Sequence, residues 1–168
     1  MKVLVTAASK HGATAGIAEA IAETLNQQGV DATLMQIGDV RSIAGYPAVV
    51  IGSGVYAGRW LKPAREFLQH HERELKERKV WLFSSGPVGN PPKPAEESPE
   101  FAQMKETAGA IEHKIFSGKV DPATLSLPER AIVAALHAPT GDFRDFDAIR
   151  SWAAGVARAL RSTPAADN

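Results

Sequence analysis

Val5-Thr6-Ala7-Ala8-Ser9-Lys10-His11-Gly12-Ala13-Thr14 is the stretch in which an apolar strand runs directly into a hydroxyl-rich turn that opens a helix. Residues 2–6 are short, apolar and rich in β-branched side chains, which predicts a buried parallel strand. From Gly12 to Leu25 the apolar residues recur at helical spacing. Because a helix N-terminus carries unpaired N–H groups and partial positive charge, this turn is a candidate site for a phosphate group.

Two interpretations of the turn are open at this point. Either Ser9 only caps the helix, or it forms an anion site together with Lys10, His11 and Thr14. The turn lacks both the G-x-G-x-x-G dinucleotide fingerprint and the G-x-x-x-x-G-K-[ST] of a P-loop. The anion site is favoured because two later strand ends carry similar loops.

The composition is that of an ordinary globular protein of one domain. The chain has 168 residues, 44% of them hydrophobic and 23% charged. We expect a domain over residues 1–161 and a disordered tail over 162–168. With 19 basic and 19 acidic side chains the formal net charge is zero, so no binding to nucleic acid is expected.

The residue types that are missing exclude several kinds of chemistry. The chain has no cysteine, which excludes disulfides, thiolate catalysis and iron–sulfur clusters. No other metal site is expected. There is no signal-peptide pattern and no apolar run long enough for a transmembrane segment, so we expect a cytoplasmic protein.

Strand-like and helix-like segments alternate along nearly the whole chain. This order predicts an α/β fold with a doubly wound, five-stranded parallel sheet and helices on both faces. The continuously apolar segment 47–53 should be a central strand, and the alternating segment 30–35 an edge strand. The other expected strands are 79–84 and 113–120, and the other expected helices are 62–76, 99–111, 128–137 and 146–160.

Ligands of such sheets bind beyond the carboxyl ends of the strands. Three loops are expected there, and the first loop is the turn over residues 9–14 described above. In the second loop, residues 52–60, three glycines allow positive φ, and Tyr56 and Trp60 can stack on a planar ring. The alternative is that these aromatic side chains fold back onto the helix that follows. The third loop, residues 83–90, offers hydroxyl and backbone N–H groups but no aromatic side chain after Phe83.

The order of elements and the motif Ser9-x-x-Gly12-x-Thr14 resemble the flavodoxin family, whose ligand is flavin mononucleotide (FMN). The resemblance implies that the first loop wraps the phosphate and that the other two line the isoalloxazine ring. The cofactor-binding residues it implies are Ser9, Lys10, His11, Gly12, Ala13, Thr14, Ser53, Gly54, Val55, Tyr56, Ala57, Gly58, Ser84, Ser85, Gly86, Pro87, Val88 and Gly89.

Three segments look closer to one branch of this family, the proteins related to menaquinone-dependent protoporphyrinogen oxidase. These segments are 51–58, 62–67 and 141–149. The chain also departs from many electron-carrier flavodoxins, because it is neutral and has no aromatic side chain in the third loop to stack on the flavin.

An open flavin face favours an FMN-dependent oxidoreductase flavoprotein that brings an organic substrate or quinone onto the ring and exchanges electrons with a redox partner protein. One alternative is a small electron-transfer flavodoxin without substrate chemistry, and another is a domain that keeps the fold without the cofactor. No catalytic residue is identified, since His11 is expected at the phosphate. A homodimer, in which one subunit covers the flavin of the other, is a further expectation.

Two features outside the loops also have two interpretations each. The inserted segment 127–139 either packs across the rim of the sheet, through Ile132, Val133 and Leu136, or serves as a contact surface: a wall for a lipophilic substrate or a quinone, or a face that docks on a membrane. The aspartates of segment 141–149 either cap the last helix or accompany Arg144 in holding a carboxylate-bearing substrate, for which Arg59 is a second candidate.

Overall fold

The computed structural model describes residues 1–56, 58–86, 99–120, 123, 125–135 and 141–162. A parallel sheet with strand order β2-β1-β3-β5-β6 forms its centre. Its strands are β1 (Lys2–Ala8), β2 (Asp31–Gln36), β3 (Ala48–Tyr56), β5 (Lys79–Ser85) and β6 (Glu112–Phe116). The prediction of a five-stranded parallel α/β sheet is confirmed, with the segment from Ala48 at its centre and the one from Asp31 at its edge.

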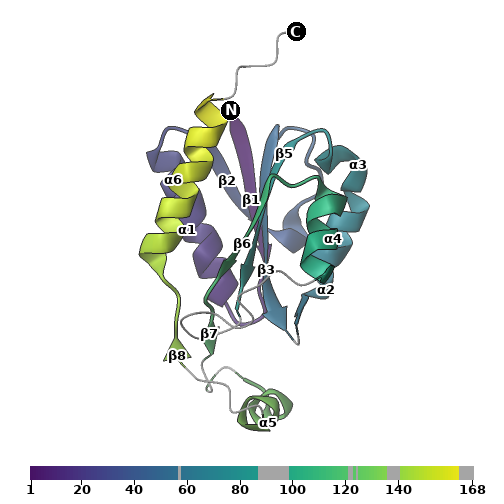
Figure 1. Ribbon diagram of the computed structural model, residues 1–168, viewed down its shortest axis with the longest axis vertical. Helices are drawn as coiled ribbons and strands as arrows, with labels where there is room; N and C mark the ends of the chain where they lie inside the picture. Colours follow the sequence, from purple (N-terminus) through teal and green to yellow (C-terminus); the bar gives the residue numbers. More distant parts are fainter. Residues whose placement is uncertain (57, 87–98, 121–122, 124, 136–140, 163–168) are drawn as a thin grey trace.

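Helices cover both faces of this sheet (Figure 1). On one face lie α1 (Ala13–Gln27) and α6 (Phe146–Ser162), and on the other lie α2 (Lys62–His70), α3 (Glu72–Leu75) and α4 (Pro99–Ala108). Alternate residues of the central strands enter two separate cores: Val50 and Phe83 face α1 and α6, whereas Ile51 and Leu82 face α2 and α4. Burial on both faces explains why these strands are apolar throughout.

A small appendage lies beyond the carboxyl ends of the parallel strands (Figure 1). It comprises β7 (Lys119–Val120), α5 (Leu127–Ala135) and β8 (Gly141–Asp142), with β7 and β8 paired antiparallel. The predicted strand 113–120 is therefore wrong in extent, because it divides into β6 and β7. The division falls next to Gly118, where a Cβ would lie 3.0 Å from the backbone nitrogen of Gly86.

Two predicted helices also end earlier than expected. The predicted helix 62–76 is interrupted at His71, whose backbone leaves helical geometry while its ring packs 4.5 Å from the ring of Phe67. The predicted helix 99–111 ends at Ala108, because Gly109 adopts a left-handed conformation with φ of 62°. At the C-terminus, α6 continues to Ser162, one residue past the expected domain end.

No helix in the described ranges is both long enough and apolar enough to cross a membrane.

Candidate functional site

The first loop joins the carboxyl end of β1 to the start of α1, as the sequence predicts. Gly12 is the N-cap of α1 and has φ of 87°, a conformation that a residue with a Cβ rarely adopts. The Ser9 hydroxyl accepts a hydrogen bond from the N–H of Gly12 at 3.1 Å, so Ser9 shapes the turn and is not itself the cap. The N–H groups of Ala13 and Thr14, in the first turn of the helix, have no intrahelical acceptor and point outward from the helix end.

Two side chains of this loop, Lys10 and His11, are already in contact with a carboxylate. Nε2 of His11 lies 2.8 Å from Oε2 of Glu129, and Nζ of Lys10 lies 3.3 Å from the same oxygen. Glu129 belongs to α5 and is 5% exposed. The expectation that His11 contacts a phosphate stays a prediction, because in this structure the imidazole contacts Glu129.

The second loop is a hairpin in the structure. The strand predicted to end at Ser53 continues to Tyr56 and pairs antiparallel with β4 (Arg59–Trp60). The hydroxyl of Ser53 accepts a hydrogen bond from the N–H of Leu61 and donates one to the carbonyl of Gly54. Ser53, Gly54, Val55 and Tyr56 are thus held at the carboxyl end of β3, and Ala57 lies outside the described residues.

The three glycines of this hairpin differ in what requires them. Of the three glycines that allow a positive φ, Gly58 adopts one, of 78°, whereas Gly52 and Gly54 do not. Gly52 is needed for space, since a Cβ there would lie 2.0 Å from the ring of Phe83 on the adjacent strand. Gly54 approaches the first loop, and a Cβ on it would lie 3.2 Å from Oγ1 of Thr14.

The two aromatic side chains of the hairpin have opposite environments. Trp60 is 1% exposed, shares a core cluster with Ala64 and Phe67 of α2, and donates a hydrogen bond from Nε1 to Oγ of Ser84 at 2.7 Å, so for Trp60 the alternative of folding back onto the following helix holds. Tyr56 is 40% exposed, and Nζ of Lys10 lies 4.6 Å from the centre of its ring. Tyr56 is therefore the aromatic surface of the hairpin that a flat ligand can reach.

The third loop follows β5, which includes Ser84 and Ser85. Oγ of Ser84 lies 2.7 Å from Nε2 of His113 as well as from Trp60, so this hydroxyl is engaged inside the protein. Gly86 has φ of 86° and donates its N–H to the carbonyl of Phe116 at 2.9 Å. The remaining predicted positions, Pro87, Val88 and Gly89, lie outside the described residues.

Sequence reasoning missed Glu129, which contacts the first loop from 118 positions away. A local signal was present in Ser126-Leu127-Pro128-Glu129, the S-x-x-E pattern of a helix capping box. The structure forms this box: Oε1 of Glu129 accepts from the N–H of Ser126 at 3.2 Å, and Oγ of Ser126 accepts from the N–H of Glu129 at 3.3 Å. The capping box predicts the helix start, but it does not predict the contact with His11.

The charged segment before α6 contacts the first loop from the other side. Arg144 donates from Nε and Nη2 to the two carboxylate oxygens of Asp142 at 2.9 and 2.8 Å, and from Nη1 to the carbonyl of Ala13 at 3.3 Å. Asp145 caps α6 by accepting from the N–H of Ala148 at 3.0 Å, which confirms a capping role for this aspartate. Arg59 pairs with Glu100. Both arginines are therefore engaged within the protein.

The position of α5 bears only in part on the interpretation that segment 127–139 packs across the rim of the sheet. Its first residue, Leu127, is 78% exposed, and the helix lies past the strand ends. The side chains of Ile132 and Val133, and the whole of Leu136, lie outside what the structure describes. No cluster of possible metal ligands occurs in the described part of the chain.

Comparison with known proteins places these features in a known context. The flavodoxin domain model matches residues 4–147. A flavodoxin from the domain Archaea is 17% identical, with a TM-score of 0.65 over 96% of this chain and 99% of that one. Flavodoxin 1 from Bacillus cereus is 15% identical, with a TM-score of 0.61 over 98% and 100% of the two chains.

A longer protein also contains this fold. Rubredoxin oxygen:oxidoreductase from Desulfovibrio gigas is 17% identical with a TM-score of 0.62. The match covers 96% of this chain but 36% of that one, so the present chain spans about a third of its length.

Proposed function

Because the chain belongs to the flavodoxin domain family, whose members bind FMN and transfer electrons to redox partners, we propose that it is an FMN-dependent redox protein with its site at the three loops. The observation that carries this proposal is the first loop, where free N–H groups of α1 and the cation Lys10 meet at the end of β1.

The residues present fit this cofactor. The N-terminus of α1 and the buried hydroxyl of Thr14 offer donors to a phosphate. The backbone at Gly54 lies close to Thr14, since a Cβ on this glycine would be 3.2 Å from Oγ1 of the threonine, so the first and second loops lie against each other. Tyr56 exposes an aromatic face beside Lys10.

Each loop has its own task in this proposal. Ser9 through Thr14 bind the phosphate, while backbone groups of Gly54, Val55 and Gly58, with those of Ser85 and Gly86, contact the ring. FMN, when bound, supplies redox chemistry with one or two electrons. The protein orients the ring and adjusts its potential through these backbone hydrogen bonds. Pro87, Val88, Gly89 and Ala57 are part of the same proposal by resemblance.

We further propose that an organic substrate or a quinone reaches the ring, as in the branch related to menaquinone-dependent protoporphyrinogen oxidase. The support is that Trp60 is held inside by Ser84, which leaves Tyr56 as the exposed aromatic side chain in the described part of the hairpin. The formal net charge of this chain is zero, whereas electron carriers that dock basic partners do so through acidic surfaces.

The second candidate is a small electron-transfer flavodoxin. It is favoured by the flavodoxins that match over nearly their full length, such as the archaeal and Bacillus cereus proteins.

Two further parts of the proposal are a cytoplasmic location and a homodimer in which one subunit covers the flavin of the other. The mass of the flavin-loaded protein in solution tests for the homodimer.

The proposal is tested by titrating the protein with FMN and following the quenching of flavin fluorescence. We expect saturable binding of one FMN per chain, and no quenching would overturn the proposal. A reductive titration then separates the two candidates. A single two-electron phase, with turnover of a quinone, supports the oxidoreductase, whereas two resolved one-electron phases without quinone turnover support the carrier.

A further inference from the structure

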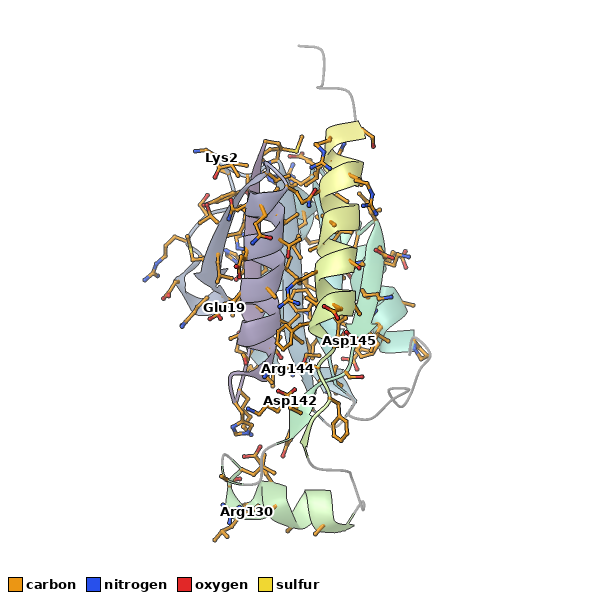
Figure 2. All side chains as sticks on the ribbon, turned by 90° about the vertical axis from the view of Figure 1, so that its left-hand side faces the viewer. Lys2, Glu19, Arg130, Asp142, Arg144 and Asp145 are labelled. Carbon is orange, nitrogen blue, oxygen red and sulfur yellow. The ribbon has the colours of Figure 1, made fainter. Side chains whose placement is uncertain are left out.

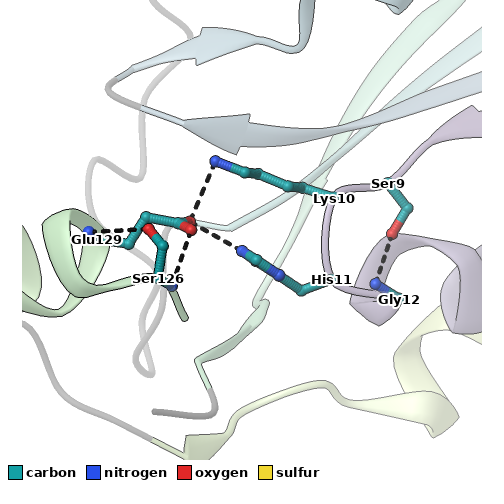
Figure 3. Close-up of polar contacts among 6 residues, drawn as sticks. All are labelled: Ser9, Lys10, His11, Gly12, Ser126 and Glu129. Atoms are coloured by element: carbon teal, nitrogen blue, oxygen red, sulfur yellow. Dashed lines mark hydrogen bonds and ion pairs between the residues drawn. The ribbon is translucent and has the colours of Figure 1, made fainter. Parts of the chain in front are cut away.

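Glu129 reaches from α5 into the first loop, where its carboxylate contacts both Lys10 and His11. Figure 3 shows its carboxylate between Lys10 and His11, on the side of the loop away from the Ser9–Gly12 hydrogen bond. One oxygen, Oε2, makes both contacts, at 3.3 and 2.8 Å. A carboxylate thus holds the contacts that an incoming phosphate would use.

The other oxygen of this carboxylate fixes it to the insert. Oε1 accepts the N–H of Ser126 in the capping box of α5, so the side chain cannot turn away without breaking the box. Hydrogen bonds from His11 and then from Ser126 lower the pKa of Glu129 to about 2. The group therefore carries a full negative charge at neutral pH.

Lys10 also contacts a second partner, Tyr56. Its Nζ lies over the ring of Tyr56 at 4.6 Å from the centre, so the lysine spans from α5 to the hairpin of the second loop. The positive charge of the first loop is consequently offset within the protein before any ligand arrives. A phosphate that binds at α1 must share or displace these contacts.

We propose that Glu129 determines how strongly the site discriminates a phosphorylated flavin from an unphosphorylated one, because its carboxylate competes with the phosphate for Lys10 and His11. This inference rests on the proposed function. Riboflavin carries the same ring without the phosphate, so its binding is insensitive to this competition. Because the coupling is reciprocal, FMN binding in turn loosens the attachment of α5 to the loop.

The deciding variant is Glu129→Gln, which removes the charge but keeps an oxygen that can accept the N–H of Ser126. The matched control is Glu72→Gln, which removes the same charge from an ion pair with Lys76 far along the chain on α3. The readouts are the dissociation constants of FMN and riboflavin, measured by fluorescence quenching, and circular dichroism to check folding.

We expect Glu129→Gln to bind FMN roughly tenfold more tightly than the unmodified protein, with riboflavin affinity unchanged. The control should change neither constant. An equal gain for both flavins, an unchanged FMN affinity, or weaker FMN binding would each overturn the inference. Weaker binding would do so because Glu129 would then be orienting Lys10 and His11 for the phosphate instead of competing with it.

A second arm separates this inference from the proposed function. Inorganic phosphate is titrated while the ring nitrogens of His11 are followed by NMR, which requires no flavin. Tighter phosphate binding in Glu129→Gln supports the competition, and equal binding in both proteins overturns it. If neither protein binds FMN or riboflavin, the proposed function fails while this phosphate arm still decides the role of Glu129.

Discussion

Arg144 lies over Gly16 so closely that a Cβ on this glycine would be 2.7 Å from Nη1 of the guanidinium. The same Nη1 donates to the carbonyl of Ala13, and Asp142 holds the guanidinium from its other side. Figure 2 shows Arg144 and Asp142 where the chain enters α6, beside the first turn of α1. The start of α1, which carries the proposed phosphate site, is therefore braced by a residue 131 positions away.

This contact predicts the effect of Gly16→Ala. In an exposed helix the change stabilises by about 1 kcal/mol, because alanine has the higher helix propensity. Here we expect a loss of about 1 kcal/mol, since the new methyl displaces Arg144. In an Arg144→Met background the change should become stabilising. Urea denaturation of the four proteins measures this cycle, and additive effects would show that the two residues are not coupled.

Gly52→Ala should be strongly destabilising. The ring of Phe83 occupies the space above this glycine in the centre of the sheet, and both residues are buried. We expect a loss of about 3 kcal/mol, because the ring must leave its place in a packed core. Gly45→Ala is the control, since a Cβ at Gly45 meets open space. Thermal or urea unfolding compares the two, and similar small effects would contradict the packing described.

The Asp142–Arg144 pair predicts a pH dependence of stability. The hydrogen bond from Arg144 lowers the pKa of Asp142 from 3.8 to about 2. A carboxyl group with a lowered pKa stabilises the fold above its unfolded value, and this contribution is lost as the pH falls from about 4 to about 2.

Because the Asp142 side chain is 42% exposed, solvent screening limits its contribution to less than about 1 kcal/mol. Asp142→Asn should therefore lose less stability across this pH range than the unmodified protein does. Asp147→Asn, at a fully exposed side chain, should follow the unmodified protein. Parallel acid titration curves for all three would speak against the pair.

Thr14→Val should weaken FMN binding. The change removes a hydroxyl at the first turn of α1 and keeps the shape of the side chain. Loss of a hydrogen bond to a charged phosphate costs about 2 kcal/mol, or roughly a thirtyfold rise in the dissociation constant. Thr24→Val, at a buried threonine of the same helix, is the control for helix effects. An unchanged affinity in Thr14→Val would mean that the phosphate binds elsewhere.

The two aromatic residues of the hairpin should respond differently to substitution. Tyr56→Ala is expected to weaken FMN and riboflavin binding equally, by about tenfold, since it removes an exposed surface for the ring. Trp60→Phe is expected to cost about 1 kcal/mol of stability, through the lost hydrogen bond to Ser84, and to leave both affinities within about twofold. A reversed pattern would place the flavin against Trp60.

Local patterns account for most of the fold. The unbroken apolar run from Ala48 could be assigned to the centre of the sheet because only a strand covered on both faces is apolar throughout. The turn from Ser9 to Thr14 was identifiable for a similar reason, since the strand, the glycine with positive φ and the helix start are contiguous in the chain. Element ends at His71 and Gly118 were not predictable, because they depend on a ring and a backbone met only in the folded state.

The alternation of strands and helices, the position of the first loop and the family resemblance could all be obtained without coordinates, because each depends on neighbours along the chain. The folded chain was needed to show that Glu129 contacts His11, that Arg144 contacts Ala13 and that Trp60 is hydrogen-bonded to Ser84. These partners are distant in sequence, and their meeting depends on the paths of the connecting segments, on which hydrophobic periodicity carries no information.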